Sequence, residues 1–352
     1  MNRGASFGIA AFTLLALQQI APAMGEEVSF AGKTITVIIG STPGGTTDSS
    51  TRIMIAGLSK YLPGSPTVII QARPGAHSIS AMNYFAQVKP DGLMAGGGSA
   101  SQLDPETTRM QQAQYDPTKF FMVGGVDLGG GVIVMRADAK ARLMDKKAAP
   151  VVMGSSSGLP SSTVMTAAWG IEYLGWNVHW VSGYPSASSG MALALERGEI
   201  DMTGFSTAGI SDAMFDRSKF SIIYQTGAKR CSTPSSLPEL KGVEIFANTM
   251  KGQIKDSVAQ KAFEYWCNSS STFVWMALPP GTPAPIVAAY RTAFAKMEAD
   301  PTLIEQGQKF SKEFAFVPYE NITALVNNLA ALSPEVTNFM PELLRKQGRP
   351  IN

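Results

Sequence analysis

The residues of this sequence best suited to bind a ligand form a short polar turn, Pro43-Gly44-Gly45-Thr46-Thr47-Asp48. Backbone N–H groups at the start of a helix have no partner within the helix and carry the positive end of its dipole. Adjacent glycines let a ligand approach the backbone closely, and threonine hydroxyls add hydrogen-bond donors. A helix that starts after this turn would make it an anion seat, most naturally for a carboxylate.

The flanking residues predict the strand and the helix that such a seat requires. A β-branched apolar run at residues 35–39 is typical of a strand and ends at Gly40. After the turn, Ile53, Met54, Leu58 and Leu62 recur at helical spacing. The segment lacks the Gly-Lys-Ser/Thr of a phosphate loop and the G-x-G-x-x-G of a dinucleotide site. The alternative at this point is a turn that only reverses the chain.

Two further turns are expected at the same edge of a sheet. A predicted strand at residues 66–71 leads into Arg73-Pro74-Gly75-Ala76-His77-Ser78, and one at residues 93–95 leads into Gly96-Gly97-Gly98-Ser99. Alternating strands and helices predict a mostly parallel sheet, whose strand ends border a crevice. We therefore expect the turns at Gly44, Gly75 and Ser99 to line one site.

The middle of the chain repeats this layout and predicts a second lobe. A glycine-rich joint at residues 124–131 precedes a predicted strand at residues 132–135. A strand at residues 151–153 then leads into a serine- and glycine-rich loop at residues 154–162 and a helix at residues 163–174. Later strands end near Tyr184 and Phe205, which are candidates for an aromatic ligand wall. Two lobes with facing loops make a cleft of the kind that binds small ligands.

Length, charge and the first residues indicate an exported protein of two lobes. The chain has 352 residues, enough for two ordinary domains, and its formal net charge of +2 argues against nucleic-acid binding. Arg3, a following apolar segment and small residues at Ala21 and Ala23 predict a signal peptide over residues 1–25, cleaved near Ala23 or Gly25. No later segment has the roughly 18 uninterrupted apolar residues of a membrane span.

The two cysteines, Cys231 and Cys267, leave two interpretations open. In an exported protein they can form a disulfide, and a single pair has only one connectivity. Two buried free thiols are the alternative, because the sequence does not give their separation in space. Two cysteines and two histidines without clustered spacing predict no structural zinc site.

Taken in order, these motifs resemble the periplasmic solute-binding proteins of tripartite tricarboxylate transporters, also called the Bug family. The resemblance covers nearly the whole chain after the leader. Its further pieces are Pro90-Asp91-Gly92, Tyr115-Asp116-Pro117, Gly198-Glu199-Ile200-Asp201 and Pro280-Gly281-Thr282-Pro283. It implies an α/β fold of two lobes, each a mixed sheet flanked by helices, that closes on a small organic mono- or dicarboxylate. The expected lobes are residues 26–132 with 272–352, and residues 133–271, with hinges near residues 132–136 and 273–277.

Carried over by position, the resemblance implies that backbone N–H groups and hydroxyls of two facing loops hold the carboxylate. The expected site residues are Pro43, Gly44, Gly45, Thr46 and Thr47 in the first loop; Arg73, Gly75, Ala76, His77 and Ser99 at its border; Ser155, Ser156, Ser157, Gly158, Ser161 and Ser162 in the second loop; and Tyr184, Phe205 and Ser206 at the cleft edge. No cofactor, metal or catalytic residue is expected. The expected partners are the carboxylate and the membrane components of a transporter, and the expected state is a periplasmic monomer.

The chain departs from the family pattern at two places. His77-Ser78 stands where further glycine is common, and Thr163-Val164 stands where a histidine is common. The class of acid, whether aliphatic, amino or aromatic, therefore stays open.

Several side chains have alternative roles. Arg73 either pairs with the ligand carboxylate or fixes its own turn through backbone carbonyls or Asp48. Asp48 is expected to cap the helix after the turn. His77 either donates to the ligand or lies on the plain surface. Three tryptophans are expected in the core of the second lobe: Trp169, Trp176 and Trp180.

An enzyme is the alternative class of protein. Gly154-Ser155-Ser156-Ser157-Gly158 matches the G-x-S-x-G nucleophile elbow of esterases, with Ser156 as nucleophile. That motif needs an acid and then a histidine downstream, and Glu172 and His179 follow too closely to fold back onto Ser156. We therefore favour a binding protein. A role as partner of a periplasmic signalling domain, or in delivering an acid to an enzyme, would use the same fold.

Overall fold

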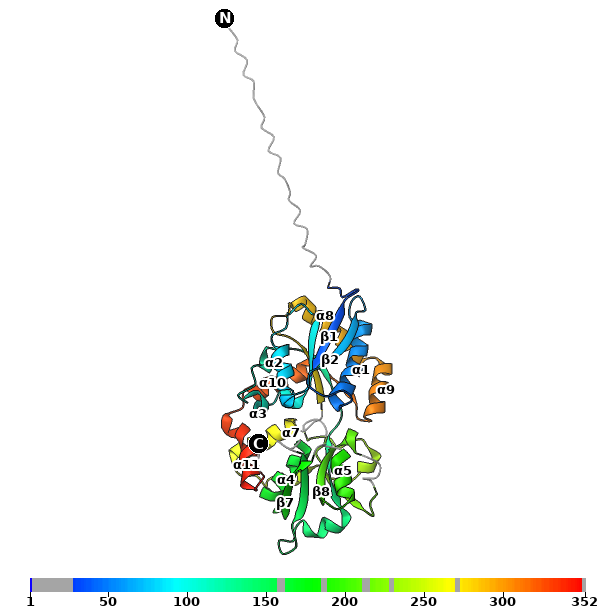
Figure 1. Ribbon diagram of the computed structural model, residues 1–352. Coiled ribbons are helices and arrows are strands. Elements are labelled where there is room, and N and C mark those ends of the chain that lie inside the picture. The colour runs from blue at the N-terminus through cyan, green and yellow to red at the C-terminus, as the bar shows by residue number, and fades with distance from the viewer. Residues whose placement is uncertain are drawn as a thin grey trace.

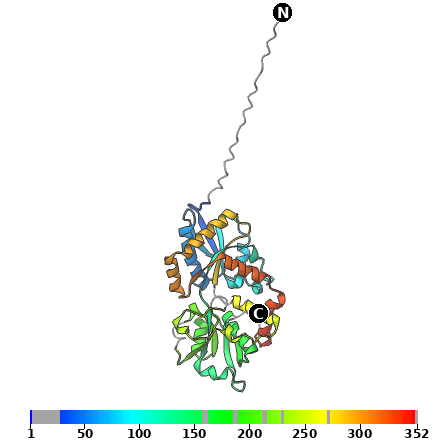
Figure 2. The same ribbon diagram turned by 180° about the vertical axis from the view of Figure 1, so that it is seen from behind.

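The chain folds into two α/β halves that lie one above the other (Figure 1). The computed structural model describes residue 1 and residues 28–156, 162–184, 189–210, 216–227, 231–269 and 273–349, so nearly all of the expected leader lies outside the described residues. Each half contains one β-sheet accompanied by helices, and Figure 2 shows the same two halves from behind. This is the two-lobed α/β fold that the sequence predicted.

The first half is built on a six-stranded sheet with the order β11-β4-β10-β3-β1-β2. Its strands are β1 (Thr34–Ile39), β2 (Thr67–Ala72), β3 (Met94–Ser99), β4 (Phe121–Asp127), β10 (Phe273–Leu278) and β11 (Ala315–Pro318). β1 pairs in parallel with β2 and β3, whereas β10 runs antiparallel to β3 and β4, and β11 antiparallel to β4. Its helices are α1 (Thr46–Tyr61), α2 (Ile79–Phe85), α3 (Pro105–Thr108), α8 (Ala284–Glu298), α9 (Pro301–Phe310) and α10 (Tyr319–Ala330).

The second half contains a five-stranded sheet with the order β7-β6-β8-β5-β9. Its strands are β5 (Gly131–Arg136), β6 (Val151–Ser156), β7 (Val178–Tyr184), β8 (Met202–Ser206) and β9 (Phe220–Gln225). β6 is parallel to β7 and β8, and β5 is antiparallel to β8 and β9. Its helices are α4 (Ser162–Tyr173), α5 (Ser189–Glu196), α6 (Phe246–Thr249) and α7 (Ser257–Ser269). Across both halves, short 3₁₀ segments occur at η1 (Ala76–Ser78), η2 (Ala100–Gln102), η3 (Pro117–Lys119), η4 (Ala137–Arg142), η5 (Thr207–Gly209) and η7 (Pro238–Leu240).

Aromatic packing fixes α4 and α7 in the core of the second half. Trp169 is fully buried, and its ring centroid lies 5.0 Å from that of Phe263 and 6.4 Å from that of Trp266 on α7. Trp176 and Trp180 are also buried, so the expectation that the three tryptophans belong to the core is confirmed. Helix α7 was not predicted from the sequence.

The last helix, α11 (Pro334–Lys346), contacts both halves. It packs along α7 and also touches α3, and its Phe339 stacks on Trp169 at 5.5 Å between centroids. Arg109, next to α3, donates to the Thr337 hydroxyl and, at 3.1 Å, to the carbonyl of Leu332. Helices α8, α9 and α10 thus accompany the first sheet, whereas α11 packs mainly along α7.

Two glycine runs that were expected as loops lie inside strands. Gly96 and Gly98 belong to β3, where a Cβ would lie 2.7 Å from the ring of Phe85 and 2.5 Å from the ring of Trp275, respectively. Gly124 belongs to β4, where a Cβ would meet the Phe294 ring at 2.2 Å. These glycines make room for aromatic rings to pack on the strand, which local sequence patterns do not reveal. Gly154 is likewise part of β6.

A short crossing, residues 128–130, brings particular edges of the two sheets together. In the first sheet Asp127 and Ser99 pair with the neighbouring residues Phe273 and Val274, so β4 ends at the edge where β1, β2 and β3 end. In the second sheet Gly131 pairs with Ser206, so β5 begins at the edge where β6, β7 and β8 end. Four Cα steps from Asp127 to Gly131 span at most about 14 Å. The carboxyl ends of both sets of parallel strands therefore adjoin this crossing.

Candidate ligand-binding site

The first loop of the expected site is an exposed turn that opens directly into α1. Gly44 has φ +82°, which glycine adopts without strain, and Gly45 is the N-cap residue with an extended backbone and no side-chain cap. The first intrahelical bond runs from Ser49 N to Gly45 O at 2.9 Å. The N–H groups of Thr46 and Thr47 thus belong to the first turn of a 16-residue helix and lie at a solvent-accessible position. This is the arrangement that suits a carboxylate.

Asp48 was predicted to cap the helix, but it stabilises the turn from within the first turn of α1 instead. Its Oδ2 accepts from Gly44 N at 2.9 Å and from Arg52 Nε at 2.9 Å, while Gly45 occupies the N-cap position. Burial would raise the pKa of Asp48, but the bonds from Arg52 and from the Gly44 N–H outweigh it and hold the pKa below its ordinary value. Asp48 is therefore ionised at neutral pH and ties the loop to the helix.

The second turn, after β2, contains two residues other than glycine in the left-handed region. Ala76 has φ +45° and Ser78 has φ +69°, so this turn keeps a backbone conformation that favours glycine. Gly75, with φ +134°, and Ala76 are exposed. His77 lies in η1, and its side chain is outside the described residues.

The Arg73 side chain packs on an aromatic ring of the first half. Its guanidinium carbon lies 3.7 Å from the centroid of the Tyr84 ring, a cation–π contact with α2. The carboxylate partner suggested for it, Asp48, is paired with Arg52 instead. Arg73 N donates to Ile39 O at 2.8 Å, so the start of the turn is held by its backbone.

Ser99 ends β3 at the same edge and is held in a polar corner. Its N–H donates to Gln102 Oε1 at 2.8 Å, and its hydroxyl lies 2.9 Å from the Ser101 hydroxyl. Trp275 Nε1 donates to Ser99 O at 2.7 Å. The three turns at Gly44, Gly75 and Ser99 follow strands that are mutually parallel, so the prediction that they share one edge is confirmed.

In the second half, Ser155 is fully buried rather than open to a cleft. Its hydroxyl accepts from Arg349 Nε at 3.1 Å and from Arg349 Nη2 at 2.9 Å. Ser156 ends β6 and Ser162 begins α4, but their side chains are outside the described residues, as are Ser157, Gly158 and Ser161 altogether.

The two aromatic candidates for a ligand wall lie in different surroundings. Tyr184 is half-buried at the end of β7, opposite Ser156. Phe205 is 3 % exposed and packs in the apolar cluster that includes Val132, Met191 and Leu195. The proposed wall position for Phe205 is therefore wrong, because strand alternation turns its side chain into the core. Ser206 is half-buried at the end of β8.

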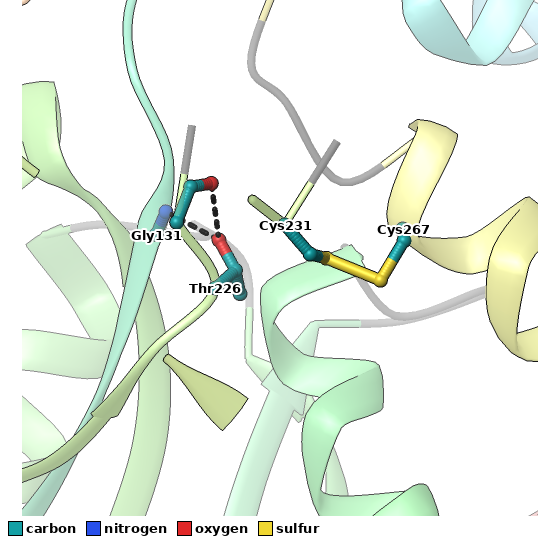
Figure 3. The surroundings of a disulfide bond; sticks show 5 residues. Gly131, Thr226, Cys231 and Cys267 are labelled. Atoms are coloured by element: carbon teal, nitrogen blue, oxygen red, sulfur yellow. Dashed lines mark hydrogen bonds between the residues drawn. A yellow bond between two sulfur atoms is a disulfide. The ribbon is translucent and has the colours of Figure 1, made fainter. Parts of the chain in front are cut away.

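Hydroxyl groups from both halves hold the crossing between these edges. Thr207 Oγ1 donates to Gly130 O at 3.2 Å, and Ser311 Oγ donates to Leu128 O at 3.0 Å. Gly131 N donates to Thr226 Oγ1 at 2.8 Å (Figure 3). Side chains of both halves therefore hold the ends of the crossing.

The disulfide predicted as one of two alternatives is present. Cys231 and Cys267 are bonded, with their Cα atoms 5.4 Å apart and a separation of 36 positions in sequence. The bond joins the segment after β9 to the end of α7, close to the Gly131–Thr226 pair (Figure 3). It anchors α7 a few residues before the chain returns to the first sheet at Phe273.

The geometry does not support the esterase interpretation. Residues 154–156 are the extended end of β6, and Gly158, which completes the motif, lies outside the described residues. In the β6–β7 register His179 pairs with Val152, four residues or about 13 Å before Ser156. Glu172, the acid candidate, forms an ion pair with Lys346 at 2.6 Å. Neither residue is placed to activate Ser156.

Two cavities in the described part of the chain lie away from the expected site. One of about 270 Å³ is lined by residues 234–238 and 240–243 with Gln225. The other, of about 290 Å³, lies between η3 and α10 and includes Arg109 and Tyr115. Within the described ranges no cluster of three or more His, Cys, Asp or Glu side chains is arranged for a metal, and no helix has the length and apolar character of a membrane span.

Sequence reasoning missed the contacts that join the two halves. Tyr265 on α7 donates to Asp104, which follows η2, and Glu313 Oε1, just before β11, accepts from Ser236 N at 3.1 Å. Arg349 was not singled out either. The only signal for it was Gly348, a glycine directly after an amphipathic helix, which is typical of a helix C-terminus.

Comparison with known proteins agrees with this fold. No protein-family profile matches the chain. A UPF0065 protein in the gbd 5′ region of Cupriavidus necator is 30% identical over 144 residues, which make up 40% of this chain and 42% of that protein. The match thus spans less than half of the relative's length.

Solved structures match over most of the chain. A TctC solute-binding protein from Polaromonas has a TM-score of 0.64 at 18% identity and covers 90% of this chain and all of its own. A protein from R. palustris with adipate has a TM-score of 0.62 at 18% identity, and the match covers 90% of this chain and 97% of that protein. The periplasmic binding protein BugD has a TM-score of 0.59 at 18% identity, and the match again covers 90% of this chain and 97% of that protein. The chain therefore has the TctC- and Bug-type binding-protein fold, and the resemblance inferred from the sequence is confirmed at the level of the fold.

Proposed function

We propose that this protein binds a small organic carboxylate between its two halves and does not catalyse a reaction. The observation that carries this proposal is the crossing at residues 128–130, which adjoins the carboxyl ends of parallel strands from both sheets. Ligands of open α/β sheets bind outside such strand ends. One of the loops there starts α1 with exposed backbone N–H groups.

The proposed site has one anion seat in each half. The first is formed by residues 43–47, with Gly75 and Ala76 on one side and Ser99 on the other. The second is formed by the loop that follows the buried Ser155 and ends at Ser162, with Tyr184 and Ser206 at its border. Phe205, Arg73 and the side chain of Asp48 support the surrounding structure instead of contacting the ligand.

Binding in this proposal works by closure of the two halves. An anion held by both loops has more favourable contacts in the closed state than in the open one, and this difference in affinity shifts the population towards closure. The crossing at residues 128–130 is the proposed pivot. The contacts of α11 with both halves would limit the range of the motion.

The biological setting is also a proposal. We infer that residues 1–25 are a cleaved signal peptide, that the protein is a periplasmic monomer, and that it delivers its ligand to the membrane components of a tripartite tricarboxylate-type transporter. The neighbour of known structure that holds adipate supports a carboxylate as ligand.

A thermal-shift screen against a panel of acids tests the function. The mature protein would be heated with succinate, adipate, glutamate or benzoate, and with the matching amides as neutral controls. A ligand that binds only the native state adds about 2.7 kcal/mol of stability at a hundredfold excess over its Kd. We expect a rise in Tm with one class of acid and none with its amide. A panel without any shift would contradict the proposal.

The variant Gly45→Val tests the first loop. Gly45 has φ −75°, and a Cβ there would meet only Thr42 O, at 3.3 Å, so valine fits the fold while its branches cover the helix N-terminus. We expect calorimetry to show at least a tenfold weaker Kd at nearly unchanged Tm. Gly45→Ala is the matched control, since it adds the Cβ alone, and its affinity should stay close to that of the wild type. Unchanged affinity in Gly45→Val would remove this loop from the site.

A further inference from the structure

The end of α11 is shaped to direct one arginine back into the protein. Gly348 has φ +76°, its N–H donates to Arg345 O at 3.0 Å, and Arg349 N donates to Leu344 O at 2.9 Å. These two bonds form a Schellman motif, which stops the helix and fixes the direction of the next residue. The Arg349 side chain is 1 % exposed as a result.

The residues around Arg349 dock this end of the chain onto the second half. Gln347 Nε2 donates to Ala168 O on α4 at 2.9 Å. Trp180 on β7 donates to Gln347 Oε1 at 3.4 Å, and the Arg349 guanidinium carbon lies 5.9 Å from the Trp180 ring. α11 itself lies beside α7, where the two halves meet (Figure 1). The last turn is therefore held from several sides.

The guanidinium reaches the strand that carries the second loop of the site. Both Nε and Nη2 of Arg349 donate to Ser155 Oγ, and both residues are almost completely buried. Ser155 is the next-to-last residue of β6, whose end adjoins the crossing between the halves. The chain carries a positive charge at the base of this loop.

The positive charge of Arg349 persists at neutral pH, and its burial reduces screening by solvent. Burial lowers the pKa of Arg349, but a guanidinium stays protonated in proteins. A charge removed from water interacts more strongly with a nearby anion than an exposed one, because solvent and salt screen it less. A carboxylate bound at the end of β6 would be stabilised by it.

We propose that Arg349 is a positioning residue of the carboxylate site: it holds Ser155 in place at the end of β6 and supplies the positive charge that favours an anion on the second half. The inference rests on the proposed function, because it concerns the same site. It assigns to the last helix a role in ligand affinity in addition to packing.

Three variants separate charge from packing. Arg349→Gln removes the charge and keeps hydrogen-bond donors, whereas Arg349→Lys keeps the charge and loses the planar fork. Lys346→Gln is the matched control, since it removes a cation three residues earlier that pairs with Glu172 on the exposed side of α4. The probe is whichever of succinate, adipate, glutamate and benzoate raises the wild-type Tm most. Its Kd is measured by calorimetry, and the Tm of each ligand-free variant is recorded.

We expect Arg349→Gln to weaken binding about tenfold or more, which corresponds to about 1.4 kcal/mol. Arg349→Lys should recover most of the affinity, and Lys346→Gln should bind like the wild type. An unchanged Kd in Arg349→Gln would overturn the inference. Equal losses in Arg349→Gln and Arg349→Lys would also overturn it, because they would show that only the shape of the side chain matters.

A substitute variant and the wild-type binding result distinguish the remaining outcomes. If Arg349→Gln does not fold, Ser155→Ala carries the test, since it removes the acceptor that positions the guanidinium. A several-fold weaker Kd in that variant supports the inference, and wild-type affinity contradicts it. A wild-type protein that binds none of the four acids would contradict the proposed function itself, whereas wild-type binding that survives in Arg349→Gln removes the role of Arg349 alone.

Discussion

The backbone N–H of Gly44 donates to the Asp48 carboxylate at 2.9 Å, so the glycine turn is tied to the helix that it opens into. The same carboxylate accepts two bonds from Arg52, at 2.9 and 3.2 Å. One buried acid thus fixes the loop and is itself neutralised by a cation on the next turn of α1. The loop is pre-formed for a ligand, and the negative charge nearest to it is compensated.

The variant Asp48→Asn measures how strongly this link stabilises the fold. An asparagine can still accept from Gly44, but hydrogen bonds to a neutral group are weaker than those to a carboxylate. We expect the free energy of unfolding in urea to fall by about 1 kcal/mol. Arg52→Gln is the comparison: the Arg52 side chain is 61% exposed, so its loss should cost less. Equal stability of Asp48→Asn and the wild type would show that the link is dispensable.

From the contacts of Asp300 we expect a loss of folding stability in acid. It is buried, caps α9 through Thr302 N at 2.9 Å, and accepts from Lys60 Nζ at 2.8 Å and Tyr61 Oη at 2.9 Å. The Lys60 bond, opposed by burial and aided by Tyr61 and Thr302, lowers the pKa of Asp300 to about 2. Because the folded pKa lies below the ordinary value of about 3.9, this stabilisation is complete above about pH 4 and is lost as the pH falls towards 2.

The variant Asp300→Asn isolates that contribution, since asparagine is also a good N-cap residue. The difference in unfolding free energy between wild type and variant should be largest above pH 4 and should shrink steadily between pH 4 and pH 2. Urea melts at half-unit intervals of pH would show it. A difference that stays constant over this range would mean that Asp300 is not the titrating group.

The disulfide predicts a redox-dependent stability. Cross-linking residues 36 apart restricts the unfolded chain, and for a loop of that length the expected contribution is about 3–4 kcal/mol. Reduction of the wild type, or the double change Cys231→Ala and Cys267→Ala, should lower the urea midpoint accordingly. The double variant should not respond to reductant, which controls for other effects of the reagent. A wild-type midpoint that reductant leaves unchanged would count against this role.

The glycines of β3 give a prediction with an internal control. A Cβ at Gly98 would lie 2.5 Å from the Trp275 ring, whereas at Gly97 the nearest atom is Ile39 Cγ2 at 3.3 Å. Overpacking a core in this way costs about 1–3 kcal/mol. Gly98→Ala should therefore lower the unfolding free energy clearly more than Gly97→Ala. Equal effects of the two changes would indicate that β3 tolerates a side chain on either face.

Local sequence patterns were sufficient for much of the fold. The β-branched run at residues 35–39 and the helical spacing after it specify β1 and α1. The shared edge of the turns at Gly44, Gly75 and Ser99 also followed from strand–helix alternation. These features depend on interactions between residues close in sequence, which is why periodicity and turn residues report them.

Tertiary structure decided what depends on residues far apart in the chain. The glycine at position 98 leaves room for the Trp275 ring on β3, and Phe205 is part of the core because it packs in the cluster that includes Met191 and Leu195 of α5. Arg73 stacks on Tyr84 instead of reaching Asp48. Arg349 contacts Ser155 across 194 residues. The sequence by itself determined the elements and the loop chemistry. The identity of the neighbours is set by packing and charge pairing in the folded state, which no local pattern encodes.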